Sequence, residues 1–278
     1  MSRHSSNTLD TDSPPCCFDK MASSTTLKIQ FQQSFTPNAL RSYLAEFIST
    51  FIFVFAVVGS TMASKKMMPD ATSDPTSLVV IGIASALGLS SAVYIAAHIS
   101  GGHANPAVTF GLAIGGHIGA VTTIFYWASQ LLGSILACFL LKLSTAGHPI
   151  PTHAIAEEMT GFGGAILESV LTFTLVYTVY AVGDTRKGSL GVIGPVAIGF
   201  VVGANVLAAG PFTGGSMNPA CSFGSALVSG NFKNQAVYWV GPLIGATIAG
   251  LLYEHVVFPH SSDSSPPGSP GTVEGPIV

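Results

Sequence analysis

Two segments of the sequence share one pattern of glycine, asparagine and proline. Residues 100–111 read SGGHANPAVTFG and residues 213–224 read TGGSMNPACSFG, so seven of the twelve positions are identical and two more pair serine with threonine. Asparagine is a favoured N-cap residue, and proline is favoured at the first position of a helix. Each Asn-Pro-Ala therefore predicts the start of a short helix, formed by Asn105, Pro106 and Ala107 in the first segment and by Asn218, Pro219 and Ala220 in the second.

These two helix starts could accept neutral molecules and repel ions. A helix N-terminus carries roughly half a positive charge, so two of them facing each other disfavour cations, protons included. The amides of Asn105 and Asn218 can donate N–H groups to a passing water. That water donates its own hydrogens outwards, which interrupts a chain of waters that could conduct protons. The alternative is that both Asn-Pro pairs are only kinks in a packed bundle, but the second copy of the pattern argues against it.

Two carboxylates lie inside apolar segments, where a charge is costly. Glu46 precedes the first copy of the pattern and Glu168 precedes the second. One interpretation is a proton relay or a cation site. The other is structural, with each carboxylate accepting hydrogen bonds from backbone N–H groups of the loop that follows. We favour the structural interpretation, because each half of the chain has one such carboxylate and one such loop to hold.

Membrane helices are the elements that must position these residues. Only 8% of the 278 residues are charged, against about 25% in soluble domains, and 48% are hydrophobic. So few charges could not cover the surface of a soluble protein, and the apolar runs lack the alternation of barrel strands. A membrane helix needs about 20 apolar residues. The charge-poor stretches predict six spans, over residues 43–64, 77–98, 119–141, 163–183, 191–210 and 236–257.

The spans fall into two halves of three, over about residues 42–142 and 163–257. Because three is odd, the second half must enter the membrane inverted, and inverted repeats share a site near the bilayer midplane. Neither copy of the pattern is long enough to cross, so each is predicted as a re-entrant half-helix. The predicted fold class is an all-α membrane protein with six transmembrane helices and two re-entrant half-helices in an inverted repeat.

Two polar tails flank this body, which covers residues 42–257. Residues 1–41 are predicted as a polar N-terminal tail, and residues 258–278, rich in serine, proline and glycine, as a disordered C-terminal tail. An even number of spans places both tails on one side. Six lysines and arginines fall on that side and four on the other, which favours cytosolic tails.

Several classes of function are disfavoured. The net charge is −3 without a basic cluster, which argues against a nucleic-acid partner. The four cysteines lack the spacing of a disulfide framework or a zinc site, and we expect no metal and no cofactor. No Ser/His/Asp set or phosphate loop supports an enzyme, and no ring of charges supports an ion channel. An ion-coupled secondary transporter, with Glu46 or Glu168 as its coupling site, stays open as the alternative.

At these motifs the sequence resembles the aquaporin (major intrinsic protein) family, over about residues 42–257. The segments GANVLAAGPFTGGSMNPA and YWVGPLIGA resemble its plant vacuolar branch, the tonoplast intrinsic proteins. NQAVYWVGPL, MTGFG and FYWASQ, with Cys221 after the second copy, resemble the fifth group of that branch most. The resemblance implies a passive channel for water and small neutral solutes, built as a homotetramer in the lipid bilayer. It implies the vacuolar membrane with cytosolic tails, the alternative being a mitochondrial or other endomembrane.

The resemblance also implies a narrow selectivity filter on the non-cytosolic side. Many water-specific members have an aromatic residue, a histidine, a small residue and an arginine there. The matching positions of this chain are Ser85, Val206, Gly215 and Cys221. Because three bulky or polar groups become small ones, we expect a wider and less polar opening. Urea then becomes a candidate solute, as do glycerol, ammonia and hydrogen peroxide.

The remaining histidines and a buried cysteine are weaker candidates. His153, in PTHAIA, stands where the vacuolar branch sometimes adds a fifth filter group; the alternative is a solvated loop residue beside two glutamates. For His98, His103 and His117 we favour packing or loop roles, and the alternative for His103, in the loop before the first Asn-Pro-Ala, is that it lines the cytosolic vestibule. Cys138 lies in the middle of a predicted span and is expected to be a small core residue.

Overall fold

Six long helices form the body of the protein. The computed structural model describes residues 31–67, 75–184, 191 and 193–257. Each long helix is apolar enough to cross a membrane, which confirms the six predicted spans. They are α2 (Pro37–Met67), α3 (Pro75–Ser100), α5 (Ala120–Ser144), α6 (Gly161–Gly183), α7 (Ile193–Thr213) and α9 (Val237–Leu251), and a π-helical turn, η2 (Leu252–Val257), continues α9.

The first helix begins earlier than predicted. Pro37 opens α2 inside the segment that the sequence assigned to the polar tail. The Thr36 hydroxyl accepts a hydrogen bond from the backbone N–H of Ala39 at 3.3 Å, which is the arrangement of a helix N-cap followed by proline. The Thr-Pro pair is therefore the true start signal. Most other ends shift by one to three residues, while α6 ends at Gly183 as predicted and the last span reaches Val257 through η2. Residues 1–30 and 258–278 of the two predicted tails lie outside the described residues.

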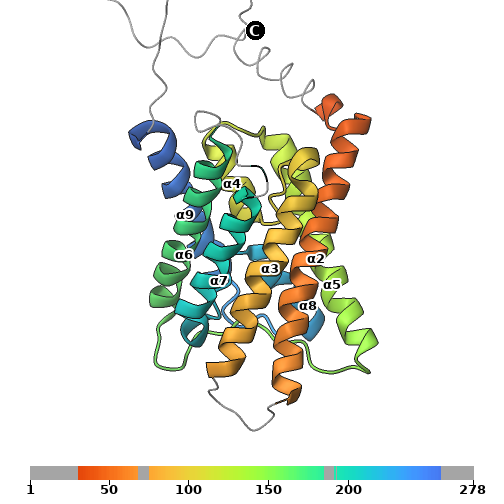
Figure 1. Ribbon diagram of the computed structural model, residues 1–278, viewed down its shortest axis with the longest axis vertical. Helices are drawn as coiled ribbons and strands as arrows, with labels where there is room; N and C mark the ends of the chain where they lie inside the picture. Colours follow the sequence, from red (N-terminus) through yellow and green to blue (C-terminus); the bar gives the residue numbers. More distant parts are fainter. Residues whose placement is uncertain (1–30, 68–74, 185–190, 192, 258–278) are drawn as a thin grey trace, which may run out of the picture.

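Two short helices lie within the ring of long ones. They are α4 (Pro106–Ile114), with 9 residues, and α8 (Pro219–Ser229), with 11, and neither is long enough to span a bilayer. In Figure 1, α4 lies toward the upper end of the molecule and α8 toward the lower end. This arrangement confirms the two re-entrant half-helices. Both ends of the described chain, the start of α2 and the end of η2, lie at the upper end.

Glycines let the long helices approach closely, and they do so at matching places in the two halves. A Cβ atom on Gly133 of α5 would overlap the carbonyl oxygen of Phe47 in α2. A Cβ atom on Gly245 of α9 would overlap the carbonyl oxygen of Ser169 in α6. The α2–α5 and α6–α9 contacts thus follow the inverted repeat. Such small-residue contacts are the usual means of helix association in a bilayer, where no hydrophobic force drives helices together.

Candidate functional site

The N-termini of α4 and α8 meet inside the bundle. Asn105 Nδ2 donates to the carbonyl oxygen of Met217 at 2.9 Å, and Asn218 Nδ2 donates to that of Ala104 at 2.9 Å. Each asparagine also caps its own helix through Oδ1, which accepts a backbone N–H two residues ahead. Both side chains are 2% exposed and line one cavity. Since an amide nitrogen carries two hydrogens, each asparagine keeps one N–H to donate into that cavity.

Each predicted carboxylate binds the loop that leads to a half-helix. Glu46 accepts hydrogen bonds from the backbone N–H groups of His103 at 2.9 Å and Ala104 at 2.8 Å. It also accepts bonds from the hydroxyl of Ser100 at 2.6 Å and the amide of Gln130 at 2.7 Å. All of these partners donate, so an ionised carboxylate satisfies them. Glu46 is fully buried and lines neither cavity described below.

Glu168 makes the equivalent contacts in the second half. It accepts hydrogen bonds from the backbone N–H groups of Ser216 at 3.0 Å and Met217 at 2.7 Å, and from the hydroxyl of Thr213 at 2.7 Å. The residue before each asparagine has a left-handed backbone, with φ of 50° at Ala104 and 53° at Met217. Non-glycine residues adopt this conformation only when their surroundings hold them in it. The carboxylates supply that restraint.

The asparagine pair lines a narrow cavity that adjoins a wide one. The narrow cavity has a volume of about 30 Å³ and is lined by both asparagines and by His103. The wide cavity has a volume of about 780 Å³. Phe53, Val202 and Ser216 line both, so the two cavities meet beside them. The asparagines thus line the narrow cavity, and the narrow and wide cavities adjoin each other along one path.

All five predicted filter residues lie along the wide cavity. Its lining includes Ser85, Val206, Gly215, Cys221 and His153. The Ser85 hydroxyl donates to the carbonyl oxygen of Ile81 at 2.7 Å, so only its lone pairs face the path. A Cβ atom on Gly215, where φ is 61°, would stand 3.2 Å from the Cα of Val206. The four positions from Ser85 to Cys221 therefore present small groups, without a charged or aromatic side chain.

His153 comes from the segment between α5 and α6 and lies in the cavity wall. Its Nδ1 stands 3.2 Å from the hydroxyl of Ser222, and its ring centroid lies 5.5 Å from that of Tyr238. The side chain is half-buried, whereas Glu157 and Glu158 are exposed. Burial lowers the pKa of His153 to about 4, so the ring is neutral near neutral pH.

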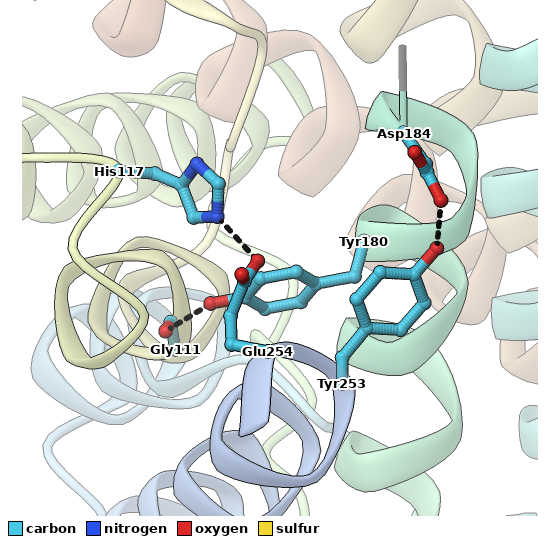
Figure 2. A network of polar contacts seen from close by, with 6 residues as sticks. All are labelled: Gly111, His117, Tyr180, Asp184, Tyr253 and Glu254. Atoms are coloured by element: carbon cyan, nitrogen blue, oxygen red, sulfur yellow. Dashed lines mark hydrogen bonds and ion pairs between the residues drawn. The ribbon is translucent and has the colours of Figure 1, made fainter. Parts of the chain in front are cut away.

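A polar network fixes the far end of α4, as Figure 2 shows. His117 Nε2 pairs with Glu254 Oε1 of η2 at 2.7 Å. The Tyr180 hydroxyl donates to the carbonyl oxygen of Gly111 in α4 at 2.8 Å. Tyr253 of η2 donates to Asp184 Oδ2 at 2.8 Å. The loop role expected for His117 is thus a specific polar contact that ties the turn after α4 to the end of the last span.

Several path-lining residues gave no signal in the sequence. Phe53, Leu175 and Val202 line the cavities, yet in their helices they look like any lipid-facing apolar residue. His103, by contrast, was favoured in a packing or loop role with the vestibule lining as its alternative, and it lines the narrow cavity. His98 is exposed near the end of α3. Cys138 is fully buried, as a core residue should be.

A family model described as Major intrinsic protein matches residues 33–253, more than half of the chain. The chain belongs to the major intrinsic protein family. It is 55% identical over 239 residues to Probable aquaporin TIP5-1 of Arabidopsis thaliana, covering 86% of this chain and 93% of that relative. It is 54% identical over 251 residues to Probable aquaporin TIP5-1 of Oryza sativa subsp. japonica, covering 87% of this chain and 93% of that relative. These relatives confirm the predicted branch and its fifth group.

A second Arabidopsis thaliana relative, Aquaporin TIP2-1, is 56% identical over 237 residues, covering 85% of this chain and 94% of its own. The solved structure of the aquaglyceroporin from Plasmodium falciparum matches with a TM-score of 0.68 and 21% identity, and the match covers 79% of this chain and 97% of that one. At that identity the likeness shows the fold. Family membership makes the chain a multi-pass membrane protein and a passive channel for water, and not an enzyme.

Proposed function

We propose that the channel passes small neutral solutes as well as water, with urea as the leading candidate. Glycerol, ammonia and hydrogen peroxide belong to the same class of small uncharged molecules. The observation that carries the proposal is the lining of the wide cavity, where Ser85, Val206, Gly215 and Cys221 contribute only small side chains. At these four positions a solute larger than water then meets neither an aromatic ring nor a guanidinium. His153 adds one neutral polar group to the same wall.

The asparagine pair forms the central constriction in this proposal. Asn105 and Asn218 each keep one N–H for the path after bonding the opposite loop. Two N–H donors and two half-helix N-termini favour an oxygen acceptor and disfavour a cation. Glu46 and Glu168 have structural roles, because their oxygens are occupied by loop donors and neither lines the narrow or the wide cavity.

A flux measurement on purified protein in vesicles tests this function against the ion-coupled alternative. A channel gives water and urea fluxes with a low activation energy, and these fluxes do not change when a proton or sodium gradient is imposed. A flux that follows either gradient supports a coupled transporter. Vesicles without protein supply the background, and a parent protein that carries water but not urea removes the solute part of the proposal.

We further propose a homotetramer in the vacuolar membrane with cytosolic tails. The support is the family resemblance, the relatives whose names carry the label TIP, and the placement of both described chain ends at one end of the molecule. A fluorescent fusion in plant cells tests the membrane, and the mitochondrial or another endomembrane location is the competing outcome. Cross-linking of the purified protein tests the tetramer.

A further inference from the structure

Asn205 of α7 is a polar side chain inside a membrane span, and its amide contacts two other elements. Its nitrogen Nδ2 lies 3.0 Å from the carbonyl oxygen of Leu171, 2.9 Å from the hydroxyl of Thr174 and 3.1 Å from the sulfur of Met217. A carbonyl oxygen can only accept a hydrogen bond, so the atom beside it must be the nitrogen of the amide. Asn205 therefore joins α7 to α6 and to the loop before α8.

The two hydrogens of that nitrogen serve three acceptors. The Thr174 hydroxyl donates to the carbonyl oxygen of Leu171 at 2.7 Å, so these two oxygens lie together and can share one hydrogen of Asn205. The second hydrogen is then directed to the sulfur of Met217, which is a weak acceptor. Methionine is an unbranched side chain with three rotatable bonds, and this contact holds it at its sulfur.

Met217 is thus held at three points, and two of them concern the asparagine pair directly. Its N–H donates to Glu168 at 2.7 Å, and its carbonyl oxygen accepts from Asn105 Nδ2 at 2.9 Å. The third point is the sulfur beside Asn205. Met217 also lines the narrow cavity. A shift of Met217 would therefore change both the position of Asn105 and the width of the path.

The first half of the chain has no such side-chain contact. The repeat pairs Met217 with Ala104, and it pairs Asn205 with Ala92. Ala104 keeps both backbone bonds, one made by its N–H and one by its carbonyl oxygen. Both alanines are fully buried, and neither lines the narrow or the wide cavity. The large residue and the amide that holds it therefore occur together, in the second half.

Asn205 also lies beside the predicted filter. The next residue is Val206, and a Cβ atom on Gly215 would stand 3.3 Å from the backbone oxygen of Asn205. Both Val206 and Gly215 line the wide cavity. The part of α7 that carries the amide therefore also forms the wall at the filter.

We propose that Asn205 is a positioning residue of the channel, which holds the side chain of Met217 in the wall of the path and so fixes the position of Asn105. Without the amide, the flexible Met217 side chain can turn into the narrow cavity. A volume of about 30 Å³ leaves little room there beside a passing water. This inference rests on the central constriction proposed above and adds the residue that keeps one of its walls in place.

Water flux per folded channel in vesicles tests the proposal. Asn205→Leu keeps the branched shape of the side chain and removes the donor. Losing one hydrogen bond lowers the ratio of held to free Met217 about fivefold, so water flux should fall by up to that factor. Asn38→Leu, the same change at an exposed position outside both cavities, is the matched control and should conduct like the parent. Equal flux in Asn205→Leu and the parent overturns the proposal.

A double variant separates positioning from helix packing. Met217→Ala gives the second half the residue that the first half has, and φ of 50° at Ala104 shows that alanine adopts this backbone here. Without the methionine side chain, Asn205 has nothing to hold, so adding Asn205→Leu to Met217→Ala should leave the flux of Met217→Ala unchanged. If Asn205→Leu lowers the flux by the same factor with and without Met217, it acts through the packing of α6 on α7, and the proposal is wrong.

A smaller substitution covers the case in which Asn205→Leu does not insert. Asn205→Ala introduces the residue found at the matching position 92. It is measured with and without Met217→Ala, and the same comparison decides.

The outcomes also separate this inference from the proposed function. If the parent passes urea and Asn205→Leu conducts water like the parent, only the inference fails. If the parent passes water alone, the solute part of the proposed function fails. In that case a loss of water flux in Asn205→Leu that disappears in the Met217→Ala background still supports the inference, and no loss overturns it.

Discussion

Replacing Glu168 tests whether the intramembrane carboxylates hold the loops or carry protons. The side chain is fully buried and accepts three hydrogen bonds, from Thr213, Ser216 and Met217. Leucine accepts none of them. Each buried donor left without a partner costs about 1–3 kcal/mol, so Glu168→Leu should lose about 3–9 kcal/mol, less the gain from no longer burying a charge. Against a typical unfolding free energy of about 5–15 kcal/mol, that is a severe loss.

Glutamine at the same position should be far milder. Its single amide oxygen can keep the bonds from Thr213 and Ser216, while its NH₂ group faces the N–H of Met217. These two facing donors cost about 1–3 kcal/mol each, less than the loss of all three acceptor contacts, so Glu168→Gln should fold and conduct water at a rate near that of the parent. Glutamine cannot carry a proton as a carboxylate does. The two substitutions therefore separate a structural role from a relay.

The assay combines thermal unfolding of the purified protein with water flux in vesicles. We expect the midpoint temperature to fall in the order parent, Glu168→Gln, Glu168→Leu, with flux per folded channel preserved in the first two. Glu157→Leu, at an exposed loop position, controls for the change of residue type. A Glu168→Gln protein that folds like the parent but loses all transport would refute the structural role and revive the relay.

Three further predictions concern the path itself. Cys221→Arg should place a permanently charged guanidinium in the wide cavity and cut urea flux more than water flux; unchanged urea flux in an inserted, water-conducting variant contradicts the proposed opening. Asn105→Asp or Asn218→Asp puts a negative charge beside the half-helix N-termini and should raise cation leak, and unaltered leak and water flux in both would count against a constriction there. Since burial lowers the pKa of His153 to about 4, the ring stays neutral between pH 7.5 and 5.5 and becomes cationic only near pH 4. Urea flux should therefore show no His153-dependent step near the ordinary histidine pKa of about 6.5. A step there that disappears in His153→Ala would contradict the lowered pKa.

The sequence predicted the parts of the fold that rest on local patterns. Long charge-free runs indicated the six spans, and the Asn-Pro-Ala pairs indicated the half-helices, because capping preferences act over a few residues. The start of α2 also depends on a local signal, the cap at Thr36 followed by Pro37, but these residues lie in a polar stretch that the sequence assigned to the N-terminal tail. The repeat predicted that Asn105 and Asn218 lie close together, because inverted repeats share a site near the bilayer midplane.

The walls of the path could not be predicted in this way. A membrane helix is apolar on every face, so its pattern does not separate a residue such as Leu175, on the path, from one that faces lipid. Gln130 gave no sign that it links Glu46 to Thr109, because the three are brought together only by helix packing. The ring contacts of Tyr126 with His103 and of Tyr238 with His153 likewise form only when the helices pack.

The two halves keep what holds the loops and differ in what faces the solute. Glycines in α5 and α9, the tyrosines at 126 and 238 and the buried carboxylates all have counterparts, because both loops need the same restraint. Gln130 has no such counterpart, since the matching position is Pro242, inside α9. Thr109 and Ser222 keep a hydroxyl at the same position of the pattern, whereas the rings that contact them, His103 and His153, come from different segments. The path is therefore narrow on one side and wide on the other although its frame is symmetric, and the wide side includes His153, which lies outside the repeated pattern.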